Sequence, residues 1–194
     1  EPYNEQEERD KEIILSMLTE AERMGEDIFS RENRMAHMTA SAWVVNRDRT
    51  KVLLAYHNIY NSWAWLGGHT DGERNLLSVA VREVCEESGL TPAHVRPAWL
   101  ISQKGDLSQG SAGDIFSLEV LAVDGHFKKG EYISSHLHLN VTYLLESDEE
   151  ETLYKKEDEN SSVKWFLPEE ALAASSEPWF AEHIYRKLNE KAGL

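Results

Sequence analysis

Residues 67–90 read GGHTDGERNLLSVAVREVCEESGL, and the second half of this stretch is typical of a single helix. Glu86 and Glu87 lie three and four residues after Glu83, a spacing that places side chains on one face of a helix. Three like charges on one face repel one another. A divalent cation would remove that conflict, and carboxylate oxygens suit Mg²⁺ or Mn²⁺ better than a soft metal. The spacing therefore predicts a metal site.

The opposite side of the same helix is suited to face a core. Its residues at helical spacing are Leu77, Val81, Val84, Cys85 and Ser88. Asn75 is suited to cap the start of the helix, and Gly89 stands where a left-handed cap usually ends one. The preceding pair, Gly67-Gly68, allows the backbone to turn tightly and to approach a ligand closely. We therefore expect a helix with one buried face and one acidic face.

The stretch resembles the Nudix box, G-x5-E-x7-R-E-U-x-E-E-x-G-U, in which U is a bulky aliphatic residue. The matching positions are Gly68, Arg82-Glu83-Val84, Glu86-Glu87 and Gly89-Leu90. One position departs, because Arg74 stands where the box has a glutamate, and Glu73 lies one residue earlier. A re-registered loop would let Glu73 take that role, which the sequence leaves open.

The resemblance implies a metal-dependent hydrolase with an α/β/α sandwich fold. It implies that Glu83, Glu86 and Glu87, with the backbone at Gly67, hold Mg²⁺ or Mn²⁺. Either Glu86 or Glu159 would take a proton from the attacking water. Glu157 and Asp158 are the near alternatives to Glu159 in the same acidic loop, and a solvated loop is the competing interpretation. Arg82 would orient a box glutamate through an ion pair.

Composition excludes several other classes of protein. The chain has 194 residues, which suits one domain, and a formal net charge of −15, which would repel a nucleic-acid duplex. A single cysteine excludes an internal disulfide and fits a reducing compartment. No apolar run is long enough to span a membrane, and no signal-peptide pattern is present. We therefore expect a cytoplasmic protein without a membrane partner.

Residues 4–27 are typical of an amphipathic helix. Its apolar stripe consists of Ile13, Ile14, Met17, Leu18 and Ala21. The stripe suits packing on the helix's own domain better than a role in dimerisation or as a lid, although a homodimer remains possible. We expect residues 1–34 to be a helical extension and residues 35–194 to be the Nudix-like domain.

The remaining elements suggest a mixed sheet between helical layers. Residues 35–46 and 51–57 are expected to form a β-hairpin. Further strands are expected at residues 95–103, 114–123, 139–145 and 162–166. A helix should begin at Pro168, and residues 177–191 should form a terminal helix. The expected fold class is therefore α/β.

Aromatic residues and histidines supply candidate substrate contacts. Trp65 could stack on a base, and a core position is equally well supported. His136 and His138 are two residues apart, so on a strand they face the same side. They could bind a metal or donate hydrogen bonds to a phosphate. The favoured interpretation is that they are polar residues on a half-exposed strand. His69 is placed to meet a phosphate, whereas His37 is expected to be structural.

The sequence thus favours an enzyme that cleaves a phosphoanhydride in a nucleoside diphosphate linked to another moiety. ADP-ribose, other nucleotide sugars, dinucleoside polyphosphates and nucleoside triphosphates all remain open as substrates. The alternative is a non-catalytic Nudix-fold sensor of a nucleotide metabolite, which the complete set of box carboxylates disfavours. An isoprenoid diphosphate isomerase shares the fold, but Cys85 is misplaced for that chemistry.

Overall fold

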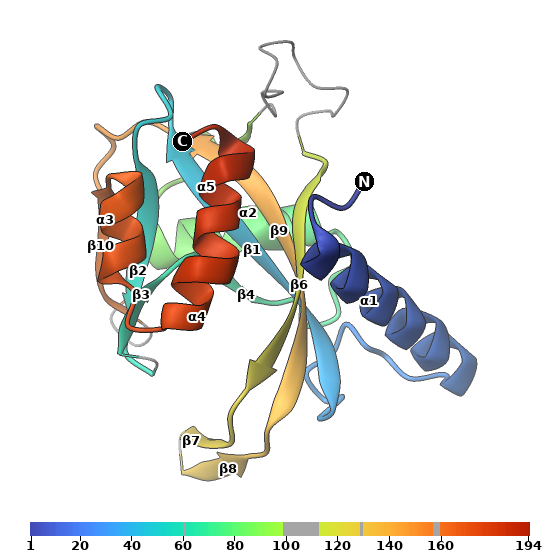
Figure 1. The fold of residues 1–194 in the computed structure, drawn as a ribbon. Coiled ribbons are helices and arrows are strands. Elements are labelled where there is room, and N and C mark those ends of the chain that lie inside the picture. Colours follow the sequence, from blue (N-terminus) through green and yellow to red (C-terminus); the bar gives the residue numbers. More distant parts are fainter. Residues whose placement is uncertain (60, 99–112, 129, 157–159) are drawn as a thin grey trace.

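The computed structural model describes residues 1–59, 61–98, 113–128, 130–156 and 160–194 (Figure 1). The helices are α1 (Glu5–Met24), α2 (Leu76–Ser88), α3 (Pro168–Ala174), α4 (Pro178–Phe180), the π-helix η1 (Ala181–Tyr185) and α5 (Arg186–Ala192). The strands of the main sheet are β1 (Ala36–Asn46), β2 (Val52–His57), β3 (Ser62–Ala64), β4 (Leu66–His69), β5 (Arg96–Pro97), β6 (Ile115–Val123), β9 (His136–Ser147) and β10 (Asn160–Phe166). A separate hairpin joins β7 (His126–Lys128) to β8 (Glu131–Ile133).

The main sheet is mixed, as predicted. Its strand order is β10-β2-β1-β9-β5, with β3 added to β2, β4 to β1 and β6 to β9. β1 runs parallel to β9 along its whole length and antiparallel to β2 and β4. The predicted hairpin is confirmed by the pairing of Val44 with Leu53. β1 therefore lies at the centre of the sheet, with one residue in two facing each side.

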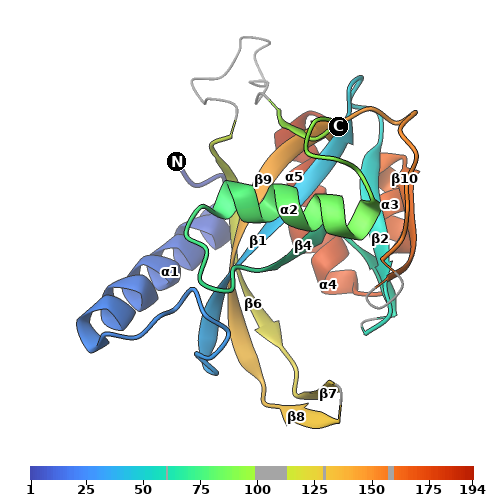
Figure 2. The ribbon, with the colours of Figure 1, turned by 180° about the vertical axis from the view of Figure 1, so that it is seen from behind.

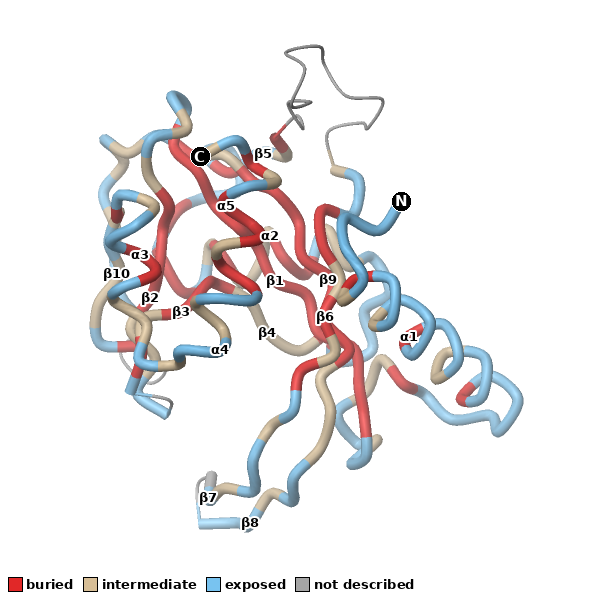
Figure 3. The backbone as a smooth tube through the Cα atoms, in the orientation of Figure 1, coloured by how far each residue is buried: buried red, intermediate tan, exposed pale blue. Residues whose placement is uncertain are grey.

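Helices cover both faces of the sheet, which confirms the α/β/α sandwich. α2 crosses one face (Figure 2), and α3, α4, η1 and α5 cover the other (Figure 1). Met38 and Ala40 of β1 pack in the same core as Val84 of α2. Trp43, on the opposite face of β1, packs in a second core with Leu188 of α5. The strands between these helical layers form the longest buried segments of the chain (Figure 3).

α1 packs against β6 at the side of the sandwich, as the apolar stripe favoured. The Asn4 side chain caps its start by accepting a hydrogen bond from the Glu7 N–H, and Gly25 ends it in the left-handed conformation. Ile14 and Ala21 are buried against the sheet, but Ile13, expected in the same stripe, is 43% exposed. The buried part of the stripe is therefore narrower than predicted.

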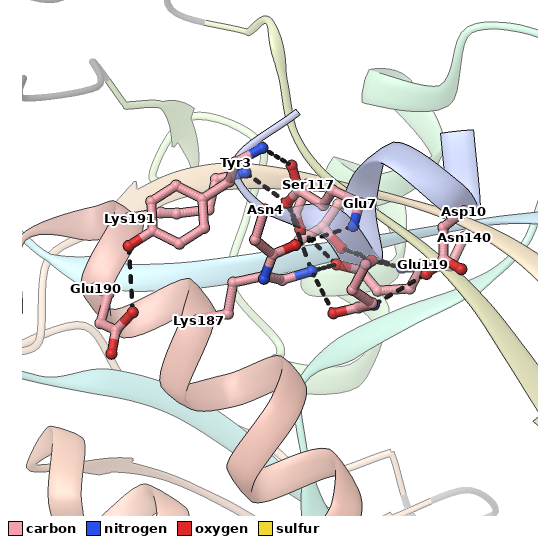
Figure 4. A network of polar contacts seen from close by, with 12 residues as sticks. Tyr3, Asn4, Glu7, Asp10, Ser117, Glu119, Asn140, Lys187, Glu190 and Lys191 are labelled. Carbon is pink, nitrogen blue, oxygen red and sulfur yellow. Dashed lines mark hydrogen bonds and ion pairs between the residues drawn. The ribbon is translucent and has the colours of Figure 1, made fainter. Parts of the chain in front are cut away.

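A buried network of charges joins α1 to β6 and α5 (Figure 4). Glu7 accepts hydrogen bonds from Lys191 Nζ and Ser117 Oγ, each at 2.6 Å, and its Oε1 lies 3.4 Å from Lys187 Nζ. Lys187 also donates to Glu119 at 3.1 Å. Burial works to raise the pKa of Glu7, but the hydrogen bonds from Lys191 and Ser117 outweigh it and lower that pKa. Glu7 is therefore held as a buried carboxylate.

Three elements differ from the sequence-based expectations. The strand expected at residues 95–103 is limited to Arg96–Pro97, and residues 99–112 lie outside the described part of the chain. β9 is longer than expected and extends over His136–Ser147. The single terminal helix is instead a succession of α4, η1 and α5.

None of the described helices is long and apolar enough to cross a membrane.

Candidate active site

α2 has the predicted caps. The Asn75 side chain accepts a hydrogen bond from the Ser78 N–H at 3.2 Å. Gly89 has a φ of 74° and donates its N–H to the Cys85 carbonyl at 2.9 Å. This positive φ favours glycine, so the end of the helix is fixed by residue type. The helix packs against β4 and β1, which places its glutamates beside the double glycine.

The expected division of α2 into an acidic face and a buried face is wrong in one respect. The buried residues of the helix are Val79, Ala80, Val84, Glu87 and Ser88. Leu77, Val81 and Cys85, which were expected in the core, are only partly buried. Because α2 lies across β4, the face that carries Glu87 is turned toward the strand rather than toward solvent.

Glu87 is the most deeply buried of the three box glutamates, with 2% of its surface exposed. Its Oε2 accepts a hydrogen bond from the Gly67 N–H at 3.2 Å, and its Oε1 lies 3.7 Å from His57 Nε2. Its backbone carbonyl accepts a hydrogen bond from the Asn160 side chain at 2.9 Å. Glu87 therefore joins α2 to β4, β2 and β10.

Glu83 lies over Gly68. A Cβ at position 68 would stand 2.5 Å from Glu83 Oε2, so only glycine leaves that carboxylate in place. Burial raises the pKa of Glu83, the adjacent Arg82 lowers it, and the negative charge of Glu86 raises it further. The net shift of the Glu83 pKa is upward.

Two cations already neutralise part of the acidic cluster. Arg82 donates to Glu83 Oε1 at 2.8 Å and to the His69 carbonyl at 3.0 Å. This is the ion pair expected of a residue that orients a box glutamate. Glu86 is the most exposed of the three glutamates, and its Oε2 accepts a hydrogen bond from Lys156 Nζ at 3.0 Å. Arg82 Nε also lies 3.7 Å from Glu86.

The chemistry of these donors fits Mg²⁺ or Mn²⁺, which prefer carboxylate and carbonyl oxygens. In the described parts of the chain, however, no three carboxylates are gathered closely enough to bind one ion without rearrangement. The carboxylates stay apart because Glu86 is bound by Lys156 and Glu87 by the Gly67 N–H. A cation at this site would compete with Lys156 for Glu86, whereas Glu87 already points toward the Gly67 backbone.

Two other positions near the box have defined surroundings. The carboxylate of Glu73 accepts a hydrogen bond from the Asn75 N–H at 2.7 Å and so lies at the start of α2. Arg74, which replaces the expected glutamate, stacks 4.6 Å over the Phe29 ring. Neither contact involves the three box glutamates. Glu159, expected as an alternative base, lies outside the described residues together with its neighbours at 157 and 158.

Trp65 belongs to the core. Only 8% of its surface is exposed, and its ring lies 5.7 Å from that of Tyr185 in the core beneath the C-terminal helices. The alternative of a base-stacking contact is therefore not supported. Trp65 connects β3 to β4 and packs in the same core as Leu188 of α5, on the side of the sheet away from α2.

His69, His136 and His138 come together, as candidate substrate contacts should, but on the side of the sheet away from Glu83. Gly68 faces Glu83, and consecutive strand residues point to opposite sides, so His69 faces the other layer. His37 joins them from β1, where it pairs in register with His138. Sequence reasoning missed His37. The alternation of His37, Thr39 and Ser41 indicates only that they share a face of β1, and the pairing of β1 with β9 brings His37 to His138.

Comparison with protein families and solved structures gives a consistent result. The model of the NUDIX domain matches residues 35–188, which includes the box and the whole sheet but not α1. Comparison with curated proteins gives no match.

Three solved structures illustrate the likeness in fold. The Ap4A hydrolase of C. elegans in a binary complex has a TM-score of 0.53 at 16% identity, over 79% of this chain and 93% of that one. The MutT protein of Methanosarcina mazei Go1 has a TM-score of 0.52 at 14% identity, over 81% and 96%. The E. coli dihydroneopterin triphosphate pyrophosphohydrolase has a TM-score of 0.50 at 14% identity, over 77% and 92%. With its box, its sandwich fold and its family match, the chain belongs to the Nudix family of pyrophosphohydrolases.

Proposed function

We propose that this chain hydrolyses a phosphoanhydride bond in a nucleoside diphosphate linked to another moiety, with Mg²⁺ or Mn²⁺ as cofactor. One observation carries the proposal. Glu83 and Glu87 of α2 both reach β4 at the double glycine, Glu83 over Gly68 and Glu87 onto the Gly67 N–H. Two carboxylates and a closely approachable backbone therefore meet at one point, with Glu86 beside them on the exposed surface.

The protein residues have separate tasks in this proposal. A cation held by Glu83, Glu86 and Glu87 would offset the charge of the diphosphate and lower the pKa of a water bound to it. The Gly67 N–H fixes the orientation of Glu87, and the absence of a side chain at Gly68 leaves room for Glu83. Arg82 orients Glu83 by donating a hydrogen bond to its Oε1.

Glu86 is well suited to accept the proton of the attacking water. With 44% of its side chain exposed, it can reach a water that enters from solvent, whereas Glu87 is enclosed. Its competitor in this role is Glu159 of the acidic loop. In either case the carboxylate accepts one proton from the water. The water oxygen forms a bond to phosphorus, and the bond between that phosphorus and the bridging oxygen breaks. The bridging oxygen departs with the leaving group.

The substrate is proposed only as a class. The three solved structures are named for dinucleoside polyphosphate, MutT and pterin triphosphate activities, so a common fold does not select among substrates. The formal net charge of −15 means that an anionic substrate needs local compensation, which the bound cation would supply. ADP-ribose, nucleotide sugars, dinucleoside polyphosphates and nucleoside triphosphates form the panel to examine.

The proposal is tested by product analysis over that panel. Each compound is incubated with Mg²⁺, Mn²⁺ or EDTA. The nucleotide products are separated by chromatography, because hydrolysis of an internal anhydride releases no free orthophosphate: a nucleotide sugar gives two monophosphates, and a nucleoside triphosphate gives a monophosphate and pyrophosphate. Metal-dependent cleavage of one class, lost in Glu86→Gln, is the expected result. Metal-dependent binding of a compound that remains intact over long incubation would contradict the proposal and support a nucleotide sensor.

A further inference from the structure

Four histidines from three strands gather on the side of the sheet opposite α2. The rings of His136, His69 and His138 lie with their centroids 4.9, 5.1 and 5.0 Å from that of His37. Among the described residues, only His37, His69 and His138 form a group whose possible ligand atoms, one from each ring, all lie within 4.8 Å of one another. The strand register produces this, because His37 pairs with His138 and Thr39 pairs with His69.

His37 has one nitrogen prepared to bind a ligand. Its Nδ1 lies 2.9 Å from the Asn33 carbonyl oxygen, which can only accept, so Nδ1 carries the proton. Its Nε2 therefore holds a lone pair. That atom is buried and has no hydrogen-bond partner among the described residues, in a side chain that is only 4% exposed. A histidine whose second nitrogen donates to a backbone carbonyl is the usual arrangement at a metal site.

His138 is likewise positioned by a neighbour. Its Nε2 lies 3.2 Å from His136 Nε2, and His136 Nδ1 lies 2.8 Å from the Ser134 carbonyl oxygen. His136 therefore links the ring of His138 to the backbone.

We propose that His37, His69 and His138 bind a transition-metal dication, Zn²⁺ foremost, at a site separate from the box glutamates. Imidazole nitrogens suit Zn²⁺, Cu²⁺ and Ni²⁺, whereas Mg²⁺ prefers oxygen. Zn–N bonds of about 2.0–2.1 Å in a tetrahedron place the ligand nitrogens roughly 3.3 Å apart, a contraction that side-chain rotation can supply. His136 acts as a positioning residue for His138.

The site would join β1, β4 and β9 at one end of the sheet. Its ligands come from strands that hydrogen-bond to each other, so a bound ion would resist separation of β4 from β1. It lies across β4 from Glu83, because Gly68 and His69 face opposite layers. Metal binding here and hydrolysis at the box are therefore separable, and the inference does not depend on the proposed function.

Metal binding itself is the readout. The untagged full chain is titrated with Zn²⁺ against a chromophoric chelator, and Co²⁺ is added in parallel to record its visible absorption. We expect one Zn²⁺ per chain and the Co²⁺ spectrum of a four-coordinate site with three imidazole nitrogens and a water in the fourth position. His37→Ala and His138→Ala should each weaken Zn²⁺ binding at least about tenfold.

Matched controls keep the test specific. His94→Ala, which removes a histidine in the loop after α2, should bind Zn²⁺ like the unmodified chain. His37→Gln is a milder second variant, and its circular dichroism should match that of the unmodified chain. Absence of Zn²⁺ binding to the unmodified chain would overturn the inference. So would Zn²⁺ binding that His37→Gln retains and Glu86→Gln loses.

Discussion

Gly68→Ala tests the link between β4 and the box glutamates without removing any charge. The added Cβ would lie 2.5 Å from Glu83 Oε2, whereas non-bonded contact begins at about 3.5 Å. The carboxylate must therefore retreat by about 1 Å. Misplacement of that size at a reacting centre can cost about 100-fold in rate, so we expect kcat to fall about 100-fold on the substrate that the panel identifies.

The stability of Gly68→Ala should change little, because Gly68 is not among the glycines with positive φ and the obstructing atom is the end of a side chain. Gly130→Ala provides the contrasting control. That glycine has a φ of 87° and open space around it, so alanine there should cost about 1 kcal/mol of unfolding free energy and leave kcat unchanged. Urea unfolding and steady-state kinetics measure both quantities.

A double-mutant cycle decides whether the effect acts through Glu83. In a Glu83→Ala background the obstructing carboxylate is gone, so Gly68→Ala should lower kcat no further. A kcat for Gly68→Ala within threefold of the unmodified chain would refute the reasoning. A full additional loss in the Glu83→Ala background would show that the added methyl group acts elsewhere.

Three further predictions follow from the ion pairs and pKa shifts. Lys187→Met removes a buried cation that lies near both Glu7 and Glu119, and it should lower the free energy of unfolding in urea by about 3–5 kcal/mol. Lys11→Met, at an exposed position, should leave that free energy unchanged. Equal unfolding curves for the two variants would contradict the role of the buried network. Because the pKa of Glu83 is raised, its proton should compete with Mg²⁺ at higher pH than in an ordinary glutamate, and Mg²⁺ affinity measured by titration should fall as pH drops through that pKa. This pH dependence should weaken in Glu83→Gln. Lys156 forms an ion pair with Glu86 and so competes with Mg²⁺ for that carboxylate. Lys156→Gln should therefore tighten Mg²⁺ binding, measured by calorimetry, by up to about fivefold. Weaker Mg²⁺ binding in this variant would contradict the competition.

Features that depend on local sequence were largely predictable. The caps of α2, the β1–β2 hairpin and the helix beginning at Pro168 each follow from residues close together in the chain. The closeness of the α2 glutamates to Gly67 and Gly68 was also predictable, because the helix and the glycines belong to one continuous motif. What periodicity could not show was the depth of Glu87, which depends on how α2 lies against β4.

Features that depend on contacts between distant parts of the chain were not predictable. Glu7 and Lys191 are 184 residues apart, and neither charge has a local pattern that indicates burial. The spacing of His136 and His138 indicated a shared face, but only the parallel pairing of β1 with β9 brings His37 to them. Trp65, between β3 and β4, was ambiguous because the spacing of apolar residues is the same whether a side chain faces a core or a ligand.

The central claim is that the box carboxylates hold the cation that drives hydrolysis. The most direct measurement is turnover by Glu86→Gln and Glu87→Gln with Mg²⁺, on the best substrate of the panel, with circular dichroism as the control for folding. Each substitution keeps the side-chain volume and removes one charge. The account predicts that turnover is abolished in both variants while the fold is retained. Undiminished turnover in both would contradict it.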